Sequence, residues 1–576
     1  MTAFDAAKEY QHWLDQPHLP AQMRDELKSL TDEAEIRDRF GADLDFGTGG
    51  LRGVMGAGLN RMNIYTVRRA TAGLALHLQA QGEDAVKAGV AIGYDCRHHS
   101  QRFAEIAACT LAAYGIRAYV APLLCPTPEL SWTVRHLQAA AGIMITASHN
   151  PPKYNGYKVY NRHGGQLLEA DADDIKARMA SFSDIFQVPS LTRDEAEAKG
   201  LLQTVSANVR ARYVETVVRE LRDPRLGDER KQLAVVYTPL HGTGNVPVRE
   251  ALRLAGYERV ALVASQVEPN GDFPTVKSPN PEEGEALSLG CQLADEVGAD
   301  LVMGTDPDAD RVGIAARDKT GQLKLLTGNQ VGALLVDYMC GRLQTGDQKG
   351  QPPIVFKTIV TSDFGRAIAQ SHGVTVEETL TGFKYIGDRI TAYEASGSYR
   401  LLVGYEESYG YLLAPIVRDK DAVQGCLAIA EMTAYHKARG ENLFDVLERL
   451  YGQFGWYGEK LVNVELSGSD GVERMKRALQ ALREQPLQVD GLQLMAVEDY
   501  LSGERRYVAD GKTERLTLPT SDVQKFLFAG GHWAAIRPSG TEPKMKMYVG
   551  VRGNSASERD DVLNRMVETL RRRVAD

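Results

Sequence analysis

The sequence predicts an α/β protein of several domains, and two observations carry this prediction. The chain has 576 residues, whereas single hydrophobic cores stop growing near about 250–300 residues. An apolar strand that leads through a polar or glycine-containing loop into a helix occurs three times, starting at Gly89, Leu233 and Pro353. Because strands alternating with helices form parallel α/β layers, we expect three α/β domains of similar design.

The two ends of the chain differ from this pattern. Residues 1–45 are polar and predicted to be helical, ending near Gly41, and a glycine-rich loop follows at Phe46–Gly58. Near the C-terminus, an amphipathic segment at Gly471–Arg483 precedes short strand-like runs, a strand at Met545–Val551 and a charged helix. This order predicts a smaller α+β domain. The predicted domains are 1–205 with the N-terminal helical extension, 206–323, 324–452 and 453–576.

The composition is that of an ordinary globular protein, with 43% hydrophobic and 25% charged residues. A net charge of −9 argues against nucleic acid as the main partner. The first residues lack the basic and apolar regions of a signal peptide, and no run of about 18 apolar residues predicts a membrane span. Six scattered cysteines without a C-x-x-C pair indicate free thiols in a reducing compartment, so we expect a cytoplasmic protein.

A candidate nucleophile lies in the segment TASHNPP, which follows the apolar run AAAGIMI. Pro151 and Pro152 prevent a helix directly after it, so Ser148 lies on a rigid loop at a strand end. Such a serine is well placed to act as a nucleophile or phosphate carrier. Lys158 follows ten residues later, and a desolvated lysine near other cations loses its proton readily enough to act as a base. An ordinary capped loop is the alternative.

A candidate metal site follows the strand-like run ADLVMGT, where three aspartates alternate with other residues: Asp306, Asp308 and Asp310. Carboxylates at this spacing converge on one cation if the loop curls, and their hard oxygens suit Mg²⁺ or Ca²⁺. An EF-hand is excluded because Arg311 and Arg317 stand where that loop requires Gly and Glu. Three protein ligands leave room for an oxygen of a phosphate on Ser148. A solvated acidic turn is the alternative.

A third segment, GYEESYG, follows the strand-like run YRLLVG. If it is extended, Glu406 and Ser408 point the same way, and a carboxylate beside a hydroxyl suits two vicinal sugar hydroxyls. A simple acidic turn is the alternative.

A fourth segment, RPSGTEPK, combines a bidentate arginine, two hydroxyls, a glycine and a lysine. These groups are able to surround a phosphate. Two further residues on glycine-flanked loops could contact a ligand: Arg52 in GTGGLRG and Lys384 in TGFKYIG. The first of these loops is not a dinucleotide fingerprint, because Arg52 replaces the third glycine.

In this order, TASHNPPKYNGYK, GTDPDADR, GYEESYG and RPSGTEPK resemble the α-D-phosphohexomutase family, most closely its phosphoglucomutase and phosphopentomutase-like branch. The resemblance extends from about Phe46 to Tyr548. It implies three similar α/β domains with mixed sheets and a C-terminal α+β domain around a central cleft, with one key loop from each. One departure is the metal loop D-P-D-A-D, where many members have glycine between aspartates.

The resemblance also implies a role for each matching residue. Ser148 would be the phosphoserine, and its oxygen would bind Mg²⁺ with Asp306, Asp308 and Asp310. Lys158 would be the general base or acid, helped by three residues: Arg52, His149 and Arg311. Glu406 and Ser408 would hold sugar hydroxyls, and Lys384 would lie in the sugar-orienting loop. Four residues would bind the non-reacting phosphate: Arg537, Ser539, Gly540 and Thr541.

The implied reaction moves phosphate between C1 and C6 of glucose through a sugar bisphosphate, with sugar 1,6-bisphosphate as activator and a sugar monophosphate as substrate. The chain would be a monomer or homodimer without a membrane partner. Within the family, mannose or pentose phosphate mutases and a glucose 1,6-bisphosphate synthase remain alternatives. A metal-dependent sugar phosphatase is a rival class that needs no grip on a distal phosphate. An inactive sugar-phosphate binding protein is disfavoured because Ser148, Lys158 and the aspartates are all present.

Overall fold

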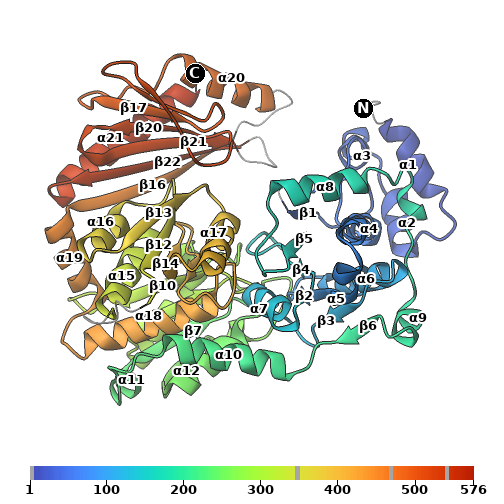
Figure 1. Ribbon diagram of the computed structural model, residues 1–576, viewed down its shortest axis with the longest axis horizontal. Coiled ribbons are helices and arrows are strands. Elements are labelled where there is room, and N and C mark those ends of the chain that lie inside the picture. Colours follow the sequence, from blue (N-terminus) through green and yellow to red (C-terminus); the bar gives the residue numbers. More distant parts are fainter. Residues whose placement is uncertain (1–4, 48, 344–349, 466–470, 539–543, 576) are drawn as a thin grey trace.

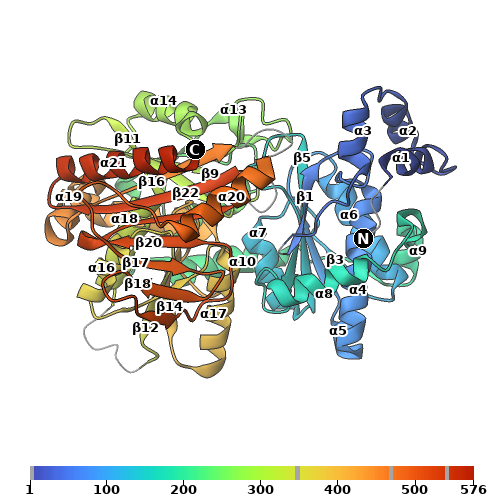
Figure 2. The ribbon, with the colours of Figure 1, turned by 90° about the horizontal axis from the view of Figure 1, so that it is seen from above.

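The computed structural model describes residues 5–47, 49–343, 350–465, 471–538 and 544–575, and in these residues the chain forms four sheets. The first domain, coloured blue to cyan, lies on one side of the molecule (Figure 1). The other three, coloured green to red, lie on the opposite side, and the view from above keeps this separation (Figure 2). Three α/β domains and a C-terminal domain confirm the predicted fold class.

Three short helices precede the first sheet: α1 (Ala6–Leu14), α2 (Ala21–Lys28) and α3 (Glu33–Phe40). They confirm the predicted helical extension and bury Trp13, Leu27 and Phe40 against the first domain. The following segment is not only a loop as predicted, because it contains strand β1 (Gly50–Val54). A Cβ atom at Gly50 would lie 2.1 Å from the carbonyl oxygen of Tyr157. The glycine therefore serves close strand packing there rather than a turn.

The first sheet has the order β1-β5-β4-β2-β3-β6. The strands β2, β3, β4 and β6 are parallel, and β5 runs antiparallel to both β4 and β1. The remaining strands of this sheet are β2 (Val90–Tyr94), β3 (Ala118–Val120), β4 (Ala141–Ile145), β5 (Tyr154–Asn161) and β6 (Leu202–Thr204). Its helices are α4 (Ile64–Gln81), α5 (Glu83–Ala88), α6 (Ser100–Ala113), α7 (Thr127–Leu137), α8 (Glu169–Met179), η1 (Ile185–Gln187) and α9 (Arg193–Ala198).

The second and third domains share one continuous hydrophobic core. The second contains α10 (Asn208–Leu221), α11 (Glu229–Gln232), β7 (Ala234–Thr238), α12 (Asn245–Ala255), β8 (Arg259–Leu262), α13 (Ala264–Val267), η2 (Gly284–Leu287), α14 (Ser288–Val297), β9 (Leu301–Thr305), β10 (Val312–Arg317) and β11 (Leu323–Leu326). The third contains α15 (Gly328–Gly341), β12 (Pro353–Thr358), α16 (Phe364–Ser371), β13 (Thr375–Thr379), α17 (Phe383–Ser396), β14 (Arg400–Tyr405), β15 (Tyr411–Leu412), α18 (Ala422–Lys437) and α19 (Leu443–Phe454).

The C-terminal domain is an antiparallel sheet in the order β16-β22-β21-β20-β17-β18-β19. One face packs under two helices, and the other buries Trp533 and Tyr548 against Ile359 and Leu380 of the third domain. The elements are β16 (Trp456–Glu465), α20 (Gly471–Glu484), β17 (Leu494–Asp499), β18 (Glu504–Tyr507), β19 (Thr513–Arg515), β20 (Gln524–Phe528), η3 (Ala529–Gly531), β21 (His532–Pro538), β22 (Lys544–Gly553) and α21 (Ala556–Ala575). The predicted amphipathic and C-terminal helices are thus confirmed.

All three α/β sheets repeat one strand arrangement. A central strand (β2, β7 or β12) lies between two parallel neighbours, and the neighbour that follows later in the chain (β4, β9 or β14) turns back into an antiparallel strand (β5, β10 or β15). Three of the four predicted site loops are these turns, because TASHNPP joins β4 to β5, DPDADR joins β9 to β10, and EESYG joins β14 to β15. Each turn contains one non-glycine residue with positive φ: Ser148 (51°), Ala309 (52°) and Tyr409 (65°).

The cysteines agree with the expectation of free thiols. All six cysteines are free thiols. No helix in the described ranges is both long and apolar enough to cross a bilayer.

A buried ion pair joins the second and third domains. Arg230, which is 1% exposed, donates from Nε and Nη2 to the two carboxylate oxygens of Glu431 on α18, both at 2.7 Å. The Glu431 carboxylate also accepts hydrogen bonds from the Asp223 amide at 2.7 Å and the Tyr257 hydroxyl at 3.0 Å. Removing its charge leaves a buried guanidinium without a counter-ion, which is more costly than losing an exposed pair.

We therefore expect Glu431→Gln to destabilise the second and third domains by about 3 kcal/mol, measured as a lower urea midpoint by circular dichroism. Glu448→Gln is the control, because Glu448 lies on α19 in an exposed pair with Lys319 at 3.5 Å. Its midpoint should stay close to that of the wild type. Equal midpoints for the two variants would contradict the assigned role of the buried pair.

Candidate active site

A cleft of about 1570 Å³ lies between the domains, and all four contribute to its lining. The predicted site residues that line it are Arg52, His149, Arg311, Glu406, Ser408 and Arg537. Ser148 and the three aspartates are 0–3% exposed, and Ser148 and Asp310 directly precede the lining residues His149 and Arg311. Residues from segments that are far apart in the sequence therefore meet in one place.

Ser148 faces the second domain. Its Oγ donates a hydrogen bond to Oδ2 of Asp306 at 2.7 Å and lies 3.1 Å from Nδ1 of His149. Its amide donates to the Thr146 hydroxyl at 2.9 Å, and its φ of 51° is in the left-handed region. The loop thus directs the serine hydroxyl toward the carboxylates.

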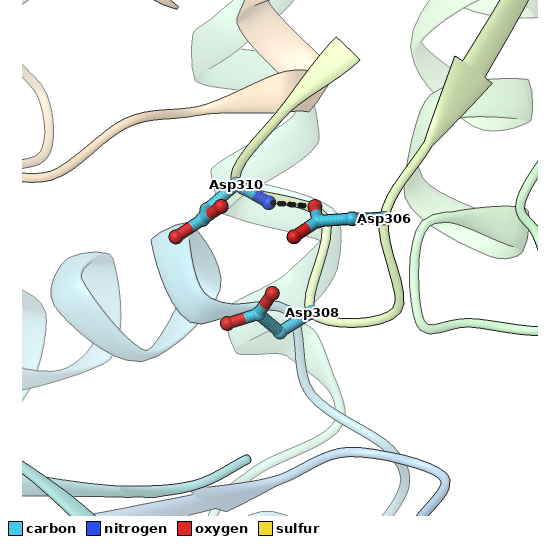
Figure 3. A group of neighbouring side chains, drawn as sticks. All are labelled: Asp306, Asp308 and Asp310. Atoms are coloured by element: carbon cyan, nitrogen blue, oxygen red, sulfur yellow. Dashed lines mark hydrogen bonds between the residues drawn. The ribbon is translucent and has the colours of Figure 1, made fainter. Parts of the chain in front are cut away.

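The three aspartates of the second domain converge (Figure 3). Oxygens of Asp306, Asp308 and Asp310 lie within 4.8 Å of one another, and all three residues are buried. Oδ1 of Asp306 accepts the amides of Asp310 at 3.1 Å and Arg311 at 3.0 Å, which fixes the curl of the loop. The left-handed Ala309 at its tip is the position where glycine is the easier choice.

The cluster has the donor set of a cation site. Among the described residues, Oδ1 of Asp308 and Oδ1 of Asp310 are buried without a hydrogen-bond partner, which is rare for buried oxygens. Burial, together with the neighbouring Asp308 and Asp310 carboxylates, raises the pKa of Asp306 well above its usual range. Burial also opposes ionisation of Asp308, but the Lys158 ammonium holds the pKa of that carboxyl below its usual range. A bound divalent cation would satisfy both free oxygens and relieve the repulsion.

Lys158 on β5 lies beside carboxylates, whereas its predicted role as a base assumed neighbouring cations. Its Nζ lies 2.9 Å from Oδ2 of Asp308 and 3.8 Å from Oδ2 of Asp310. Oδ2 of Asp308 also accepts the Thr127 hydroxyl at 2.8 Å. Lys158 therefore joins the first domain to the carboxylate cluster as a counter-ion.

Three further predicted residues lie near the Ser148 loop. Arg52 on β1 donates to the side-chain oxygen of Asn150 at 3.2 Å. Burial, and then the charges of Arg311 and Arg52, hold the pKa of His149 well below its usual range, so its imidazole is neutral near pH 7. Arg311 pairs with Glu282, and its Nε lies 3.7 Å from Oδ1 of Asp310.

The EESYG segment is a turn and not extended as the sugar-binding prediction assumed. Tyr409 has a φ of 65°, and Glu406, Glu407 and Ser408 nevertheless all line the cleft. Oε1 of Glu406 accepts the Gly382 amide at 3.0 Å. Burial raises the pKa of Glu406, although the nearby Lys420 ammonium opposes this.

Lys384 lies near the cleft but contacts the first domain. Its Nζ is 2.7 Å from Oε1 of Glu169 at the start of α8, and the Tyr385 hydroxyl donates to the same oxygen at 2.5 Å. The preceding residues Thr381–Phe383 line the cleft. The lysine thus links the first and third domains beside it.

The fourth domain contributes Arg537, whose Nε and Nη2 lie 3.3 Å from the Tyr548 hydroxyl. Ser539, Gly540 and Thr541, predicted to bind phosphate, lie outside the described residues. Lys546 is opposite Arg537 in the β21–β22 register and also lines the cleft. Burial, followed by the charges of Arg537 and Arg311, lowers the pKa of Lys546.

Sequence reasoning missed four residues of the site: Thr127, Glu282, Lys420 and Lys546. Lys420 bridges Asp310 at 3.1 Å and Asp419 at 3.0 Å. The alternation of basic and apolar residues in KMKMY could have indicated Lys546, because it places Met545 and Met547 on the buried face. Thr127 and Lys420 are brought to the aspartates by contacts between domains, whereas Glu282 pairs with Arg311 inside the second domain.

Four family models match the chain in order. They are described as phosphoglucomutase/phosphomannomutase α/β/α domain I (residues 43–184), domain II (211–321), domain III (327–454) and the C-terminal domain (461–568). A phosphoglucomutase of Staphylococcus epidermidis is 39% identical over 537 residues, covering 92% of this chain and 94% of the relative. One from Staphylococcus aureus is 36% identical over 539 residues, covering 93% and 94%.

Solved structures share the fold. A putative phosphomannomutase from Thermus thermophilus has a TM-score of 0.67 at 23% identity, covering 93% of this chain and 100% of that one. A Paramecium phosphoglucomutase, pp63/parafusin, has a TM-score of 0.65 at 18% identity, covering 92% and 95%. The four matching models and the curated relatives show that the chain belongs to the phosphoglucomutase/phosphomannomutase family, the α-D-phosphohexomutases.

Proposed function

We propose that the chain is a phosphoglucomutase that moves a phosphoryl group between C1 and C6 of glucose through phosphorylated Ser148. The observation that carries this proposal is the 2.7 Å contact between Ser148 Oγ and Asp306, together with the cations Arg537 and Lys546 of the fourth domain, which line the neighbouring cleft. A phosphoryl carrier needs the first feature. A mutase also needs a place for the phosphate that is not reacting.

In the proposed reaction, the phosphorus–oxygen bond at Ser148 breaks as a sugar hydroxyl bonds to the phosphorus. The hydroxyl proton must finally reach Ser148 Oγ, and we assign its transfer to Lys158, with neutral His149 at 3.1 Å from that oxygen. Arg52 and Arg311 neutralise charge on the transferred group. The bisphosphate then turns over, and Ser148 takes the other phosphoryl group.

We propose Mg²⁺ as the cation of the aspartate cluster. Asp306, Asp308, Asp310 and a phosphoryl oxygen on Ser148 would hold it, and it would supply charge neutralisation when bound. Glucose 1,6-bisphosphate would act as activator by phosphorylating Ser148.

We assign Glu406 and Ser408 to the sugar hydroxyls, because both line the cleft on the third domain. Lys384 would orient the sugar from its loop, and Arg537, Ser539, Gly540 and Thr541 would hold the distal phosphate. Mannose and pentose phosphate mutases are not favoured, because the curated relatives are phosphoglucomutases. A phosphatase would not need the cationic pair Arg537 and Lys546.

We further propose the domain limits 1–205, 206–323, 324–452 and 453–576. We also propose the cytoplasm as the location, because six free thiols suit a reducing compartment.

We expect Ser148→Ala to lower mutase turnover more than about 10³-fold, because it removes the phosphoryl acceptor. The measurement is formation of glucose 6-phosphate from glucose 1-phosphate with a trace of the bisphosphate. Intact mass should show one added phosphoryl group on the wild type after incubation with glucose 1,6-bisphosphate, and none on the variant.

The control is Ser396→Ala, at an exposed serine at the end of α17, which should retain full turnover. Near-normal mutase activity of Ser148→Ala would disprove the covalent scheme. Steady release of inorganic phosphate by the wild type without glucose 6-phosphate would instead identify a phosphatase.

We expect Asp308→Asn to weaken Mg²⁺ binding at least about tenfold, because even a supporting residue of a metal site contributes that much. Calorimetric titration of the unphosphorylated protein measures the effect without any turnover. Asp318→Asn is the control, because Asp318 accepts hydrogen bonds in a turn after β10 and is not part of the cluster. Equal affinities of wild type and Asp308→Asn would refute the cluster as the Mg²⁺ site.

A further inference from the structure

The proposed mechanism does not use Arg97, but its buried guanidinium is hydrogen-bonded to the Ser148 loop. The residue follows the central strand β2 and is 3% exposed. Nη2 donates to the carbonyl oxygens of Ser148 at 2.6 Å and of Asn150. Nη1 donates to the carbonyl oxygens of Pro151 at 3.0 Å and Tyr154 at 3.1 Å. Three carbonyls of the loop and that of Tyr154 at the start of β5 therefore share a single side chain.

This arrangement requires an arginine. The loop contains the left-handed Ser148 and two prolines without amide protons, so it is not part of a regular ladder and its inward carbonyls need other donors. The planar guanidinium presents five donors in a fixed fork, whereas a lysine has three on one flexible nitrogen. A lysine at position 97 would keep the charge but leave carbonyls of the loop without a partner.

Asp95 holds the arginine in place. Its Oδ1 accepts the Arg97 amide at 2.9 Å and the Ser100 hydroxyl at 2.7 Å. Its Oδ2 lies 3.4 Å from Nε of Arg97. The guanidinium is thus fixed at its stem by a carboxylate and at its tip by the serine loop.

A residue of the second domain also packs against this guanidinium. The ring of Phe273, 1% exposed, lies 5.0 Å from Cζ of Arg97. Two residues earlier, a Cβ atom at Gly271 would lie 2.9 Å from the His98 amide and 3.0 Å from the Cys96 carbonyl oxygen. The backbone of this loop therefore packs directly against the Arg97 segment, so the domain with the aspartates also fixes the loop with the serine.

In the other two domains, the segment after the central strand also supports the turn, but with shorter side chains. Thr243, after β7, donates from its amide and hydroxyl to the Pro307 carbonyl at 2.8 and 2.9 Å. Thr361, after β12, donates to the Glu407 carboxylate at 3.0 Å. The loop that carries the nucleophile has the most extensive support of the three.

We propose that Arg97 is a positioning residue for phosphoryl transfer. With Phe273 of the second domain, it holds the Ser148 loop so that Oγ faces the carboxylate cluster. This inference rests on the proposed function. Its effect belongs to the transfer step rather than to sugar binding, because every hydrogen bond of the guanidinium goes to the serine loop or to the first residue of the strand that follows it.

The test is Arg97→Lys, measured by rapid-quench phosphorylation of the unphosphorylated protein with glucose 1,6-bisphosphate. We expect the transfer rate to fall about 100-fold, because a displacement near 1 Å has an effect of that size, while KM stays within about threefold. Arg230→Lys is the matched control, since Arg230 is equally buried and donates to two backbone carbonyls at 2.6 Å far from Ser148. It should lower the melting temperature without a specific loss of transfer rate.

Hydrogen–deuterium exchange provides a readout that is independent of activity. Arg97→Lys should increase exchange in residues 146–157 and leave β7 and β9 unchanged. Wild-type rate and wild-type exchange in this variant would overturn the proposal. If the wild type itself accepts no phosphoryl group, the proposed function fails, and the exchange result still decides whether Arg97 positions the loop.

Phe273→Leu tests the same support of the Ser148 loop with Arg97 intact. This variant decides the outcome if Arg97→Lys does not fold. Removing the ring should lower the transfer rate about tenfold with unchanged KM and increase exchange in the same residues. An unchanged transfer rate in Phe273→Leu would overturn the part assigned to the second domain.

Discussion

The arrangement of the domains depends on three carboxylates that are buried next to one another. Asp306, Asp308 and Asp310 are at most 2% exposed, and burying unpaired charge is costly. Counter-ions come from different domains, with Lys158 from the first and Lys420 from the third. The first domain also contributes the hydroxyls of Ser148 and Thr127. The cluster thus stabilises one arrangement of three domains, and the same arrangement forms the site.

The short polar loops at strand ends were accessible to sequence reasoning. Strand positions follow from apolar runs such as LVMGT, and the motif residues then lie where each strand ends. The turn at Glu406–Tyr409 was harder to predict, because the residue with left-handed backbone, Tyr409, is not a glycine. Strand β1 was predicted as part of a loop because it contains glycines, but the glycine at its start permits close approach to β5.

The contacts of the site were less predictable than its residues. Lys158 was identified, but its carboxylate partners lie 150 residues away in the chain. Lys384 pairs with Glu169 across a separation of 215 residues. No local pattern contains such a distance, so only the packing of complete domains determines which charges meet. The positive φ values of Ser148 and Ala309 were equally hard to predict from the sequence. Each costs about 1–2 kcal/mol, which the surrounding contacts must offset.

The turn after β4, β9 and β14 occupies the same place in three similar sheets, yet it carries the proposed nucleophile in the first, a carboxylate cluster in the second and the pair proposed to bind the sugar in the third. Each turn carries chemical groups of its own and has a supporting side chain in its own domain, such as Arg97, Thr243 or Thr361, although contacts between domains also hold the turns in place. With the proposed roles, substitutions in the turn of the third domain would change the sugar that is bound and leave the phosphoryl-transfer groups of the first and second domains in place. Repetition of one supersecondary unit thus gives the molecule separately evolvable parts.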